Sequence, residues 1–116
     1  MVIADLEAGV GTLSRIKDGS IDLLLVVTEP TVKSMEVARR AVDLARSKRS
    51  RVIVVGNKVV DDADRIRLQT AFGPDLHLVP DDPAIREADR DGLAPIDTAP
   101  DSPGVRAISD LATVLA

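Results

Sequence analysis

The stretch that decides the fold is Leu23-Leu24-Leu25-Val26-Val27, which has a counterpart further along the chain in Val52-Ile53-Val54-Val55. Both runs are continuously aliphatic, whereas a strand with one solvated face alternates apolar and polar residues. Continuous runs of this kind are typical of strands that helices cover on both faces of a parallel sheet. The segment between them has apolar residues at helical spacing, so the pattern predicts a βαβ unit with a right-handed crossover.

The remainder of the chain continues this alternation of strand and helix. Leu76 to Val79 is a weaker strand candidate, and Gly73-Pro74 before it ends a helix. Residues 91–103 are rich in Pro, Gly and Asp and are expected to be linker-like. Four places have the signature of a helix start: Ser34, Asp61 or Asp62, Asp82-Pro83 and Ser102-Pro103. The predicted fold is α/β, a three-layer parallel sheet with helices on both faces.

Length and composition restrict the class of protein. The 116 residues predict one domain, residues 1–116, with an aliphatic core because Phe72 is the only aromatic residue. A net charge of −4 argues against broad binding to nucleic acid or to an acidic membrane. The absence of cysteine fits a reducing cytoplasm, and no apolar run is long enough to cross a bilayer. The apolar stub Val2-Ile3-Ala4 is expected to be the end of a strand that leads into Asp5.

Polar residues follow each predicted strand, where parallel sheets bind ligands. They are Asp5, Thr28-Glu29-Pro30, Asn57-Lys58 and Pro80-Asp81-Asp82. An acidic residue after an apolar strand, with a glycine a few positions later, is the pattern of a Walker B aspartate and its switch loop, here Asp5 and Gly9. The alternative for Asp5 is a helix cap, which is common at strand ends.

Asn57 is a candidate for base recognition because a carboxamide has both a donor and an acceptor for the edge of a purine. Asparagine is also a frequent turn residue, and Lys58 either packs its stem across the base or is exposed. Two further clusters have simpler interpretations. Asp61, Asp62 and Asp64 fit a helix start better than a metal site, and the basic residues between 46 and 51 fit a helix end better than a site for an anionic partner.

In this order, Asp5 to Gly9, Asn57-Lys58 and the stretch Val79 to Ala88 resemble the second half of MinD/ParA-type P-loop ATPases. The similarity is greatest to the CooC-like ATPases, which mature carbon monoxide dehydrogenase. It is carried by the motif Asp5-Leu6-Glu7-Ala8-Gly9 and by the segments Val26 to Pro30 and Val55 to Val59. MinD and ParA relatives stay as alternatives. The resemblance covers essentially the whole chain and implies that it is the C-terminal portion of a P-loop ATPase domain.

The resemblance implies a site for ATP or ADP with Mg²⁺. Asp5 would order the magnesium ion through water, and Gly9 would belong to the second switch loop. Asn57 would recognise adenine with Lys58 beside it, and Pro80, Asp81 and Asp82 would form the loop that closes over the base. The full-length form would serve metal insertion, such as nickel insertion into a client metalloenzyme, and relatives commonly form homodimers across the nucleotide.

The sequence contains no glycine-rich phosphate loop ending in Gly-Lys-Ser/Thr. The resemblance places that loop in the N-terminal half, on a strand between the one ending at Asp5 and the one from Asp22 to Thr28. We therefore expect no meaningful ATP hydrolysis by this chain alone, since phosphoryl transfer depends on positioning the phosphates. The two flanking strands would either pair directly or recruit a partner such as a complementary P-loop subunit. The rival hypothesis is a non-catalytic protein-interaction module.

Overall fold

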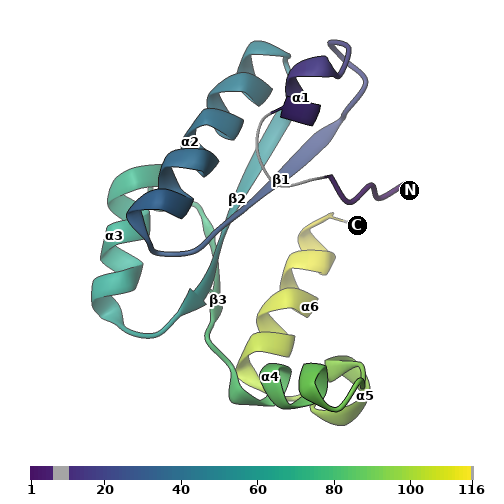
Figure 1. The fold of residues 1–116 in the computed structure, drawn as a ribbon, viewed down its shortest axis with the longest axis vertical. Helices are drawn as coiled ribbons and strands as arrows, with labels where there is room; N and C mark the ends of the chain where they lie inside the picture. Colours follow the sequence, from purple (N-terminus) through teal and green to yellow (C-terminus); the bar gives the residue numbers. More distant parts are fainter. Residues whose placement is uncertain (7–10, 116) are drawn as a thin grey trace.

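The computed structural model describes residues 1–6 and 11–115, and within them strands alternate with helices (Figure 1). The elements are α1 (Gly11–Arg15), β1 (Leu23–Thr28), α2 (Val32–Ser47), β2 (Arg51–Val59), α3 (Asp62–Phe72), β3 (His77–Pro80), α4 (Pro83–Arg90), α5 (Pro95–Thr98) and α6 (Pro103–Leu115). None of the helices in the described ranges is both long and apolar enough to cross a membrane.

The three strands form a parallel sheet in the order β1-β2-β3. Leu23 pairs with Arg51 and Thr28 with Gly56, so the two aliphatic runs lie side by side in register. The weaker strand predicted near Leu76 is confirmed as β3. Because all three strands run in one direction, their carboxyl ends lie at the same edge of the sheet.

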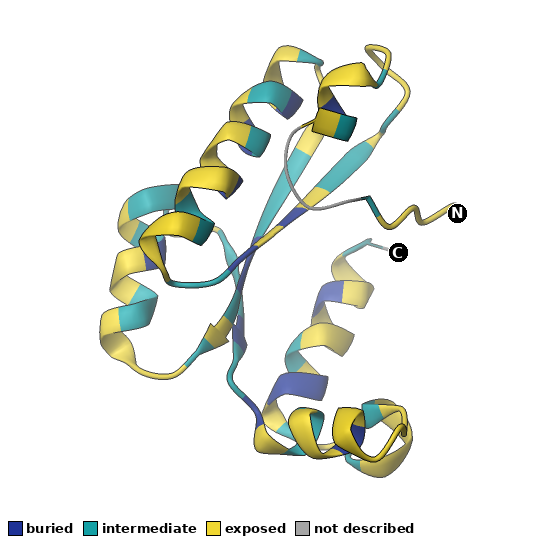
Figure 2. Cartoon of the chain, viewed as in Figure 1, coloured by how far each residue is buried: buried dark blue, intermediate teal, exposed yellow. Residues whose placement is uncertain are grey.

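Helices lie on both sides of this sheet (Figure 1). On one side α2 covers β1 and β2, where Val26, Ala38 and Val42 form a buried cluster with Phe72 at its border. On the other side α6 packs on β2 and β3, where Val55, Val79 and Leu111 form a second cluster. Figure 2 shows the resulting pattern, with the buried residues of α2 turned toward the sheet and its outer side exposed. The α/β class with helices on both faces is therefore confirmed.

One face of β1 differs from the prediction. Leu25 and Val27 lie on the α6 side of the sheet, yet they are 37% and 61% exposed, because α6 covers only β2 and β3. Their neighbours on the opposite face, Val26 and Thr28, are buried under α2. The aliphatic run of β1 is thus covered on one face only within the described residues.

The prediction of a strand at Val2-Ile3-Ala4 is wrong. Residues 1–6 have no regular secondary structure, and Val2 and Ile3 are 95% and 83% exposed. The expectation that this segment pairs directly with β1 is also wrong, since no strand among the described residues pairs with the outer edge of β1. An apolar segment this short forms a strand only when a neighbouring strand takes up its backbone hydrogen bonds.

Most helix starts agree with their sequence signatures. Asp61 caps α3 by accepting a hydrogen bond from the Asp64 amide, and Asp82 caps α4, which has proline at its first position. The start of α6 at Pro103 is also confirmed. Ser34 is not the cap of α2, because the helix begins one turn earlier with Thr31 as its cap. The stretch 91–103, expected to be linker-like, contains the short helix α5.

Candidate functional site

The candidate site lies at the carboxyl edge of the sheet, where residues that follow all three strands meet. We call it the strand-end cluster, and it consists of Glu29, Asn57, Lys58, Asp81 and Arg86. Glu29 directly follows β1, and Asp81 directly follows β3. Asn57 and Lys58 lie within β2, close to its carboxyl end. Backbone pairing holds the strand ends together, since the Asp81 amide donates to the Val59 carbonyl at 2.9 Å.

A β-bulge shapes the end of β2. Gly56 pairs with Leu78 and Val59 with Pro80, so Asn57 and Lys58 together stand opposite Val79. Lys58 has a φ of 56°, in the left-handed region that lysine seldom adopts. Bulges re-aim side chains and are frequent beside functional sites. This bulge falls on the two residues that the sequence singled out for base recognition.

An ion pair joins the ends of β1 and β2. Lys58 Nζ lies 2.6 Å from Glu29 Oε1, and both side chains are partly exposed. The hydrogen bond with Glu29, and then the charge of Glu29, raise the pKa of Lys58. Asp81 adds to this rise, while desolvation and the charge of Arg86 oppose it. Lys58 therefore carries its positive charge at neutral pH and is directed toward β1.

The loop after β3 is held by two carboxylates that act differently. Asp81 forms an exposed ion pair with Arg86 of α4, 2.5 Å between Oδ1 and Nη1. Asp82 is 7% exposed and accepts from two backbone amides, Ala84 at 2.9 Å and Gly104 at 2.8 Å. One carboxylate thus fixes the first turns of α4 and α6 together. The sequence indicated only the α4 half of this arrangement, because the contact with Gly104 joins residues far apart in the chain.

The pKa of Asp82 lies below its ordinary value of 3.8. The Ser102 hydroxyl makes the largest contribution, although its geometry falls short of a regular hydrogen bond. The Gly104 and Ala84 amides and the charge of Arg86 act in the same direction, and burial acts against them. A carboxylate stabilised in this way is a structural anchor for the Pro80 to Asp82 loop.

The Asp82 anchor predicts a pH-dependent stability. A folded-state pKa below the unfolded value means that Asp82 stabilises the fold above pH 3.8, and that this stabilisation is lost as the pH falls through the folded pKa. We expect Asp82→Asn to unfold at lower urea concentration than the wild type at pH 7, and this difference to shrink below pH 3.8. Urea titrations at several pH values measure it, with the exposed Asp75→Asn as control. A constant difference across that range would contradict the assignment.

Among the described residues, the others that the sequence singled out for a site do not form a common cluster with one another. Asn57 is half-buried, and its side chain makes no hydrogen bond to another described residue. Asp5 is exposed and follows no strand, and Gly9 lies outside the described residues. Asp61, Asp62 and Asp64 act in capping and local pairs, and the described part of the chain holds no cluster of three or more potential metal ligands.

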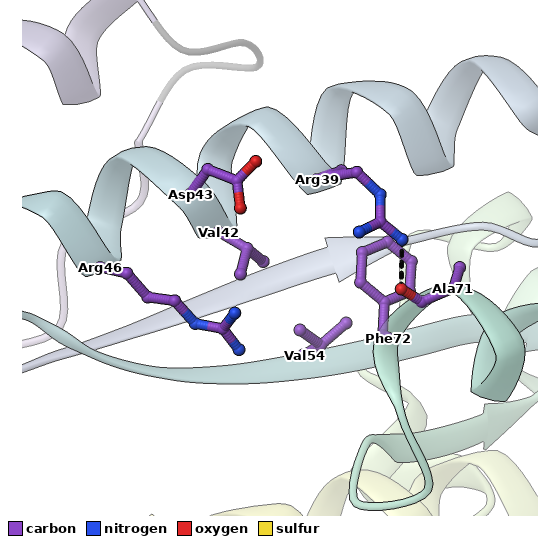
Figure 3. Close-up of a pocket in the computed structure, with 7 residues that line it drawn as sticks. All are labelled: Arg39, Val42, Asp43, Arg46, Val54, Ala71 and Phe72. Carbon is purple, nitrogen blue, oxygen red and sulfur yellow. Dashed lines mark hydrogen bonds between the residues drawn. The ribbon is translucent and has the colours of Figure 1, made fainter.

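Two small hollows lie away from the strand-end cluster. One, of about 80 Å³, lies between α2, α3 and β2, with Arg39 stacked 5.4 Å from the centre of the Phe72 ring and bonded to the Ala71 carbonyl (Figure 3). The other, of about 140 Å³, is lined by α4, the end of α5 and Leu93. Ligand pockets usually measure about 300–1,000 Å³. Both hollows are smaller than that range.

Comparisons with known proteins find two similar proteins, one of them described as ATP-binding. No protein-family model matches it. It is 28% identical over 120 aligned positions to an uncharacterized ATP-binding protein of Methanocaldococcus jannaschii, an alignment that covers 99% of this chain and 46% of that protein. It is 32% identical over 109 positions to the carbon monoxide dehydrogenase accessory protein CooC of Rhodospirillum rubrum, covering 85% of this chain and 39% of CooC.

These similarities support a relationship to CooC-like ATPases, in agreement with the motifs. The chain spans less than half the length of either relative. Sequence reasoning gave no role to Arg86 and did not foresee that Glu29 and Lys58 pair. Their signal was weak, because charged residues directly after strands are common and only the fold shows which of them meet.

Proposed function

We propose that this chain binds the base of an adenine nucleotide at the strand-end cluster. The observation that carries the proposal is the β-bulge that sets Asn57 and Lys58 at the carboxyl edge of a parallel sheet, the edge at which such sheets bind ligands. The similarity to an ATP-binding protein and to CooC supports the choice of nucleotide.

Asn57 supplies the recognition in this proposal. Its carboxamide is half-buried and free of hydrogen bonds to the described residues, so a donor and an acceptor are available for the edge of adenine. Lys58 lies beside it, and the loop Pro80-Asp81-Asp82 forms the neighbouring wall. The loop is held firmly from behind by the Asp82 anchor, so little ordering is needed when the base binds.

The phosphates need groups that this sheet edge does not supply. We propose that Asp5 and Gly9 contribute to an Mg²⁺ and switch region, and that a phosphate loop comes from further sequence or from a complementary P-loop subunit. The proposal for this chain is binding and not hydrolysis, because catalysis of phosphoryl transfer rests on groups that hold the transferred phosphate.

We propose that the chain is the C-terminal portion of a MinD/ParA-like P-loop ATPase domain, and that the whole protein serves metal insertion. The name of CooC, a carbon monoxide dehydrogenase accessory protein, supports a role in the maturation of an enzyme of that kind. Nickel as the inserted metal and a homodimer as the assembly are part of the proposal and rest on the resemblance alone. A MinD- or ParA-type positioning or partition role is the alternative within the same superfamily.

A second candidate function rests on the edge of the sheet formed by β1. This strand has no charged residue or proline to discourage further pairing, and Leu25 and Val27 are exposed on one of its faces. Natural edge strands are usually protected by such residues or by a covering element. Among the described residues no strand pairs with this edge, which favours an interaction module that binds a partner polypeptide without nucleotide chemistry.

Nucleotide-dependent stability distinguishes the two functions. A ligand that binds only the folded state at 100 times its Kd stabilises that state by about 2.7 kcal/mol. We therefore expect saturating ADP to raise the Tm of the 116-residue chain by several degrees. Differential scanning fluorimetry with ADP measures this shift, with ribose 5-phosphate as a control that lacks the base. An unchanged Tm at millimolar ADP would contradict adenine-nucleotide binding and support the interaction module.

A further inference from the structure

Hydrogen bonds hold the backbone of Glu29, a partly exposed acidic residue, on both sides. Its amide donates to Ser34 Oγ at 2.9 Å, and its carbonyl accepts from Thr28 Oγ1 at 3.1 Å. The two hydroxyls lie 3.2 Å apart, and Thr28 is 1% exposed. The end of β1 and the first turn of α2 therefore hold the backbone of Glu29 on both sides.

The loop that contains Glu29 is also tied to α3. Arg67 Nη1 donates to the Pro30 carbonyl at 3.1 Å. A carboxylate that starts from such an anchored backbone has fewer positions to sample than one on a free loop. Its charge is therefore presented at a defined place between the ends of β1 and β2.

The carboxylate of Glu29 fixes the position of the Lys58 side chain. Its ammonium lies 2.6 Å from Glu29 Oε1, so the lysine stem crosses from the end of β2 toward β1. Lys58 also has a left-handed backbone within the bulge, and a non-glycine residue holds that conformation only when its surroundings compensate the cost. An ion pair this exposed adds little to folding stability, so we expect its loss to change the direction of Lys58 without unfolding the protein.

Asn57 is coupled to the same geometry, because it shares the bulge with Lys58 and precedes it directly. Pairing with β3 sets the bulge, and the ion pair with Glu29 fixes the direction of the Lys58 side chain beside Asn57. We infer that Glu29 is a positioning residue for the adenine site, which acts through Lys58 to orient the base-recognising pair Asn57-Lys58. The inference rests on the proposed nucleotide-binding function. The Thr28 and Ser34 hydroxyls contribute by holding the backbone of Glu29.

Four proteins test this inference: the wild type, Glu29→Gln, Lys58→Met and the double variant. ADP and GDP affinities are measured for each by isothermal titration calorimetry. Glu29→Gln is expected to weaken ADP binding about fivefold and to reduce the preference for ADP over GDP. In the Lys58→Met background the same substitution is expected to have no further effect, because its target is gone. Glu36→Gln on the exposed side of α2 is the matched control for the lost charge.

A ligand-free measurement accompanies the titrations. In ¹H–¹⁵N spectra, Glu29→Gln is expected to shift the Asn57 side-chain amide and the Lys58 backbone amide, whereas Glu36→Gln leaves both in place. If the wild type binds ADP and Glu29→Gln keeps the affinity and the base preference, the positioning role is overturned and the proposed function stands. If the wild type fails to bind ADP, the proposed function is overturned and the inference with it.

Discussion

Asn57→Ala is expected to weaken ADP binding by about tenfold or more. The alanine removes both the donor and the acceptor that would meet the edge of adenine, and water replaces them imperfectly in a half-buried position. Because the Asn57 side chain makes no hydrogen bond to another described residue, the ligand-free variant should unfold at nearly the wild-type temperature. Calorimetric titration with ADP and thermal unfolding without ligand measure the two quantities.

The controls for Asn57 separate recognition from a general loss of structure. Gln69→Ala removes the other side-chain carboxamide of the chain, which bonds to Arg65 on α3, and is expected to leave ADP binding unchanged. Asn57→Asp keeps the shape but removes the donor, so it should also bind ADP weakly. Wild-type affinity in Asn57→Ala would show that this residue does not recognise the base and would remove the main support for the proposed function.

Gly104→Ala is expected to destabilise the fold by about 1–2 kcal/mol, and to lower Tm by roughly 5–10 °C. A Cβ at this position would lie 2.8 Å from Asp82 Cβ and 2.9 Å from Asp82 Oδ2. Asp82 has little room to move, because its carboxylate is held by the amides of Ala84 and Gly104. Alanine is otherwise favoured over glycine in a helix by about 1 kcal/mol, so the contact must outweigh a gain in helix propensity.

Gly11→Ala is the matched control, since no described atom lies within 4 Å of a Cβ at that position in α1. Chemical denaturation of both variants gives the free energies of unfolding. Stability equal to or above the wild type in Gly104→Ala would show that the Asp82 anchor yields easily. In that case the loop Pro80 to Asp82 would not be the firm wall that the proposed site requires.

Several features of this protein followed from local sequence patterns. The aliphatic runs of β1 and β2 indicated a parallel α/β sheet, and short-range capping chemistry identified the starts of α3 and α4 at Asp61 and Asp82. These signals depend on neighbouring residues only, which is why they can be read without a structure. Except for Asp5, which follows no strand, the polar residues predicted at the strand ends lie at one edge of the sheet, since parallel strands share the direction of their carboxyl ends.

Other features depended on contacts between distant segments. The predicted strand at Val2 to Ala4 failed because no neighbouring strand pairs with it, and the open face at Leu25 and Val27 depends on where α6 lies. The bulge at Asn57-Lys58 is likewise a property of pairing with β3.

The sequence by itself therefore determined the fold class, the starts of α3, α4 and α6, and the polar residues at the ends of β1, β2 and β3. Only the tertiary structure decided that Lys58 pairs with Glu29 and that Asp82 holds Gly104. The physical reason is range: helix caps and strand patterns arise from interactions over a few residues, whereas an ion pair or a shared cap exists only after the sheet has brought its strand ends together.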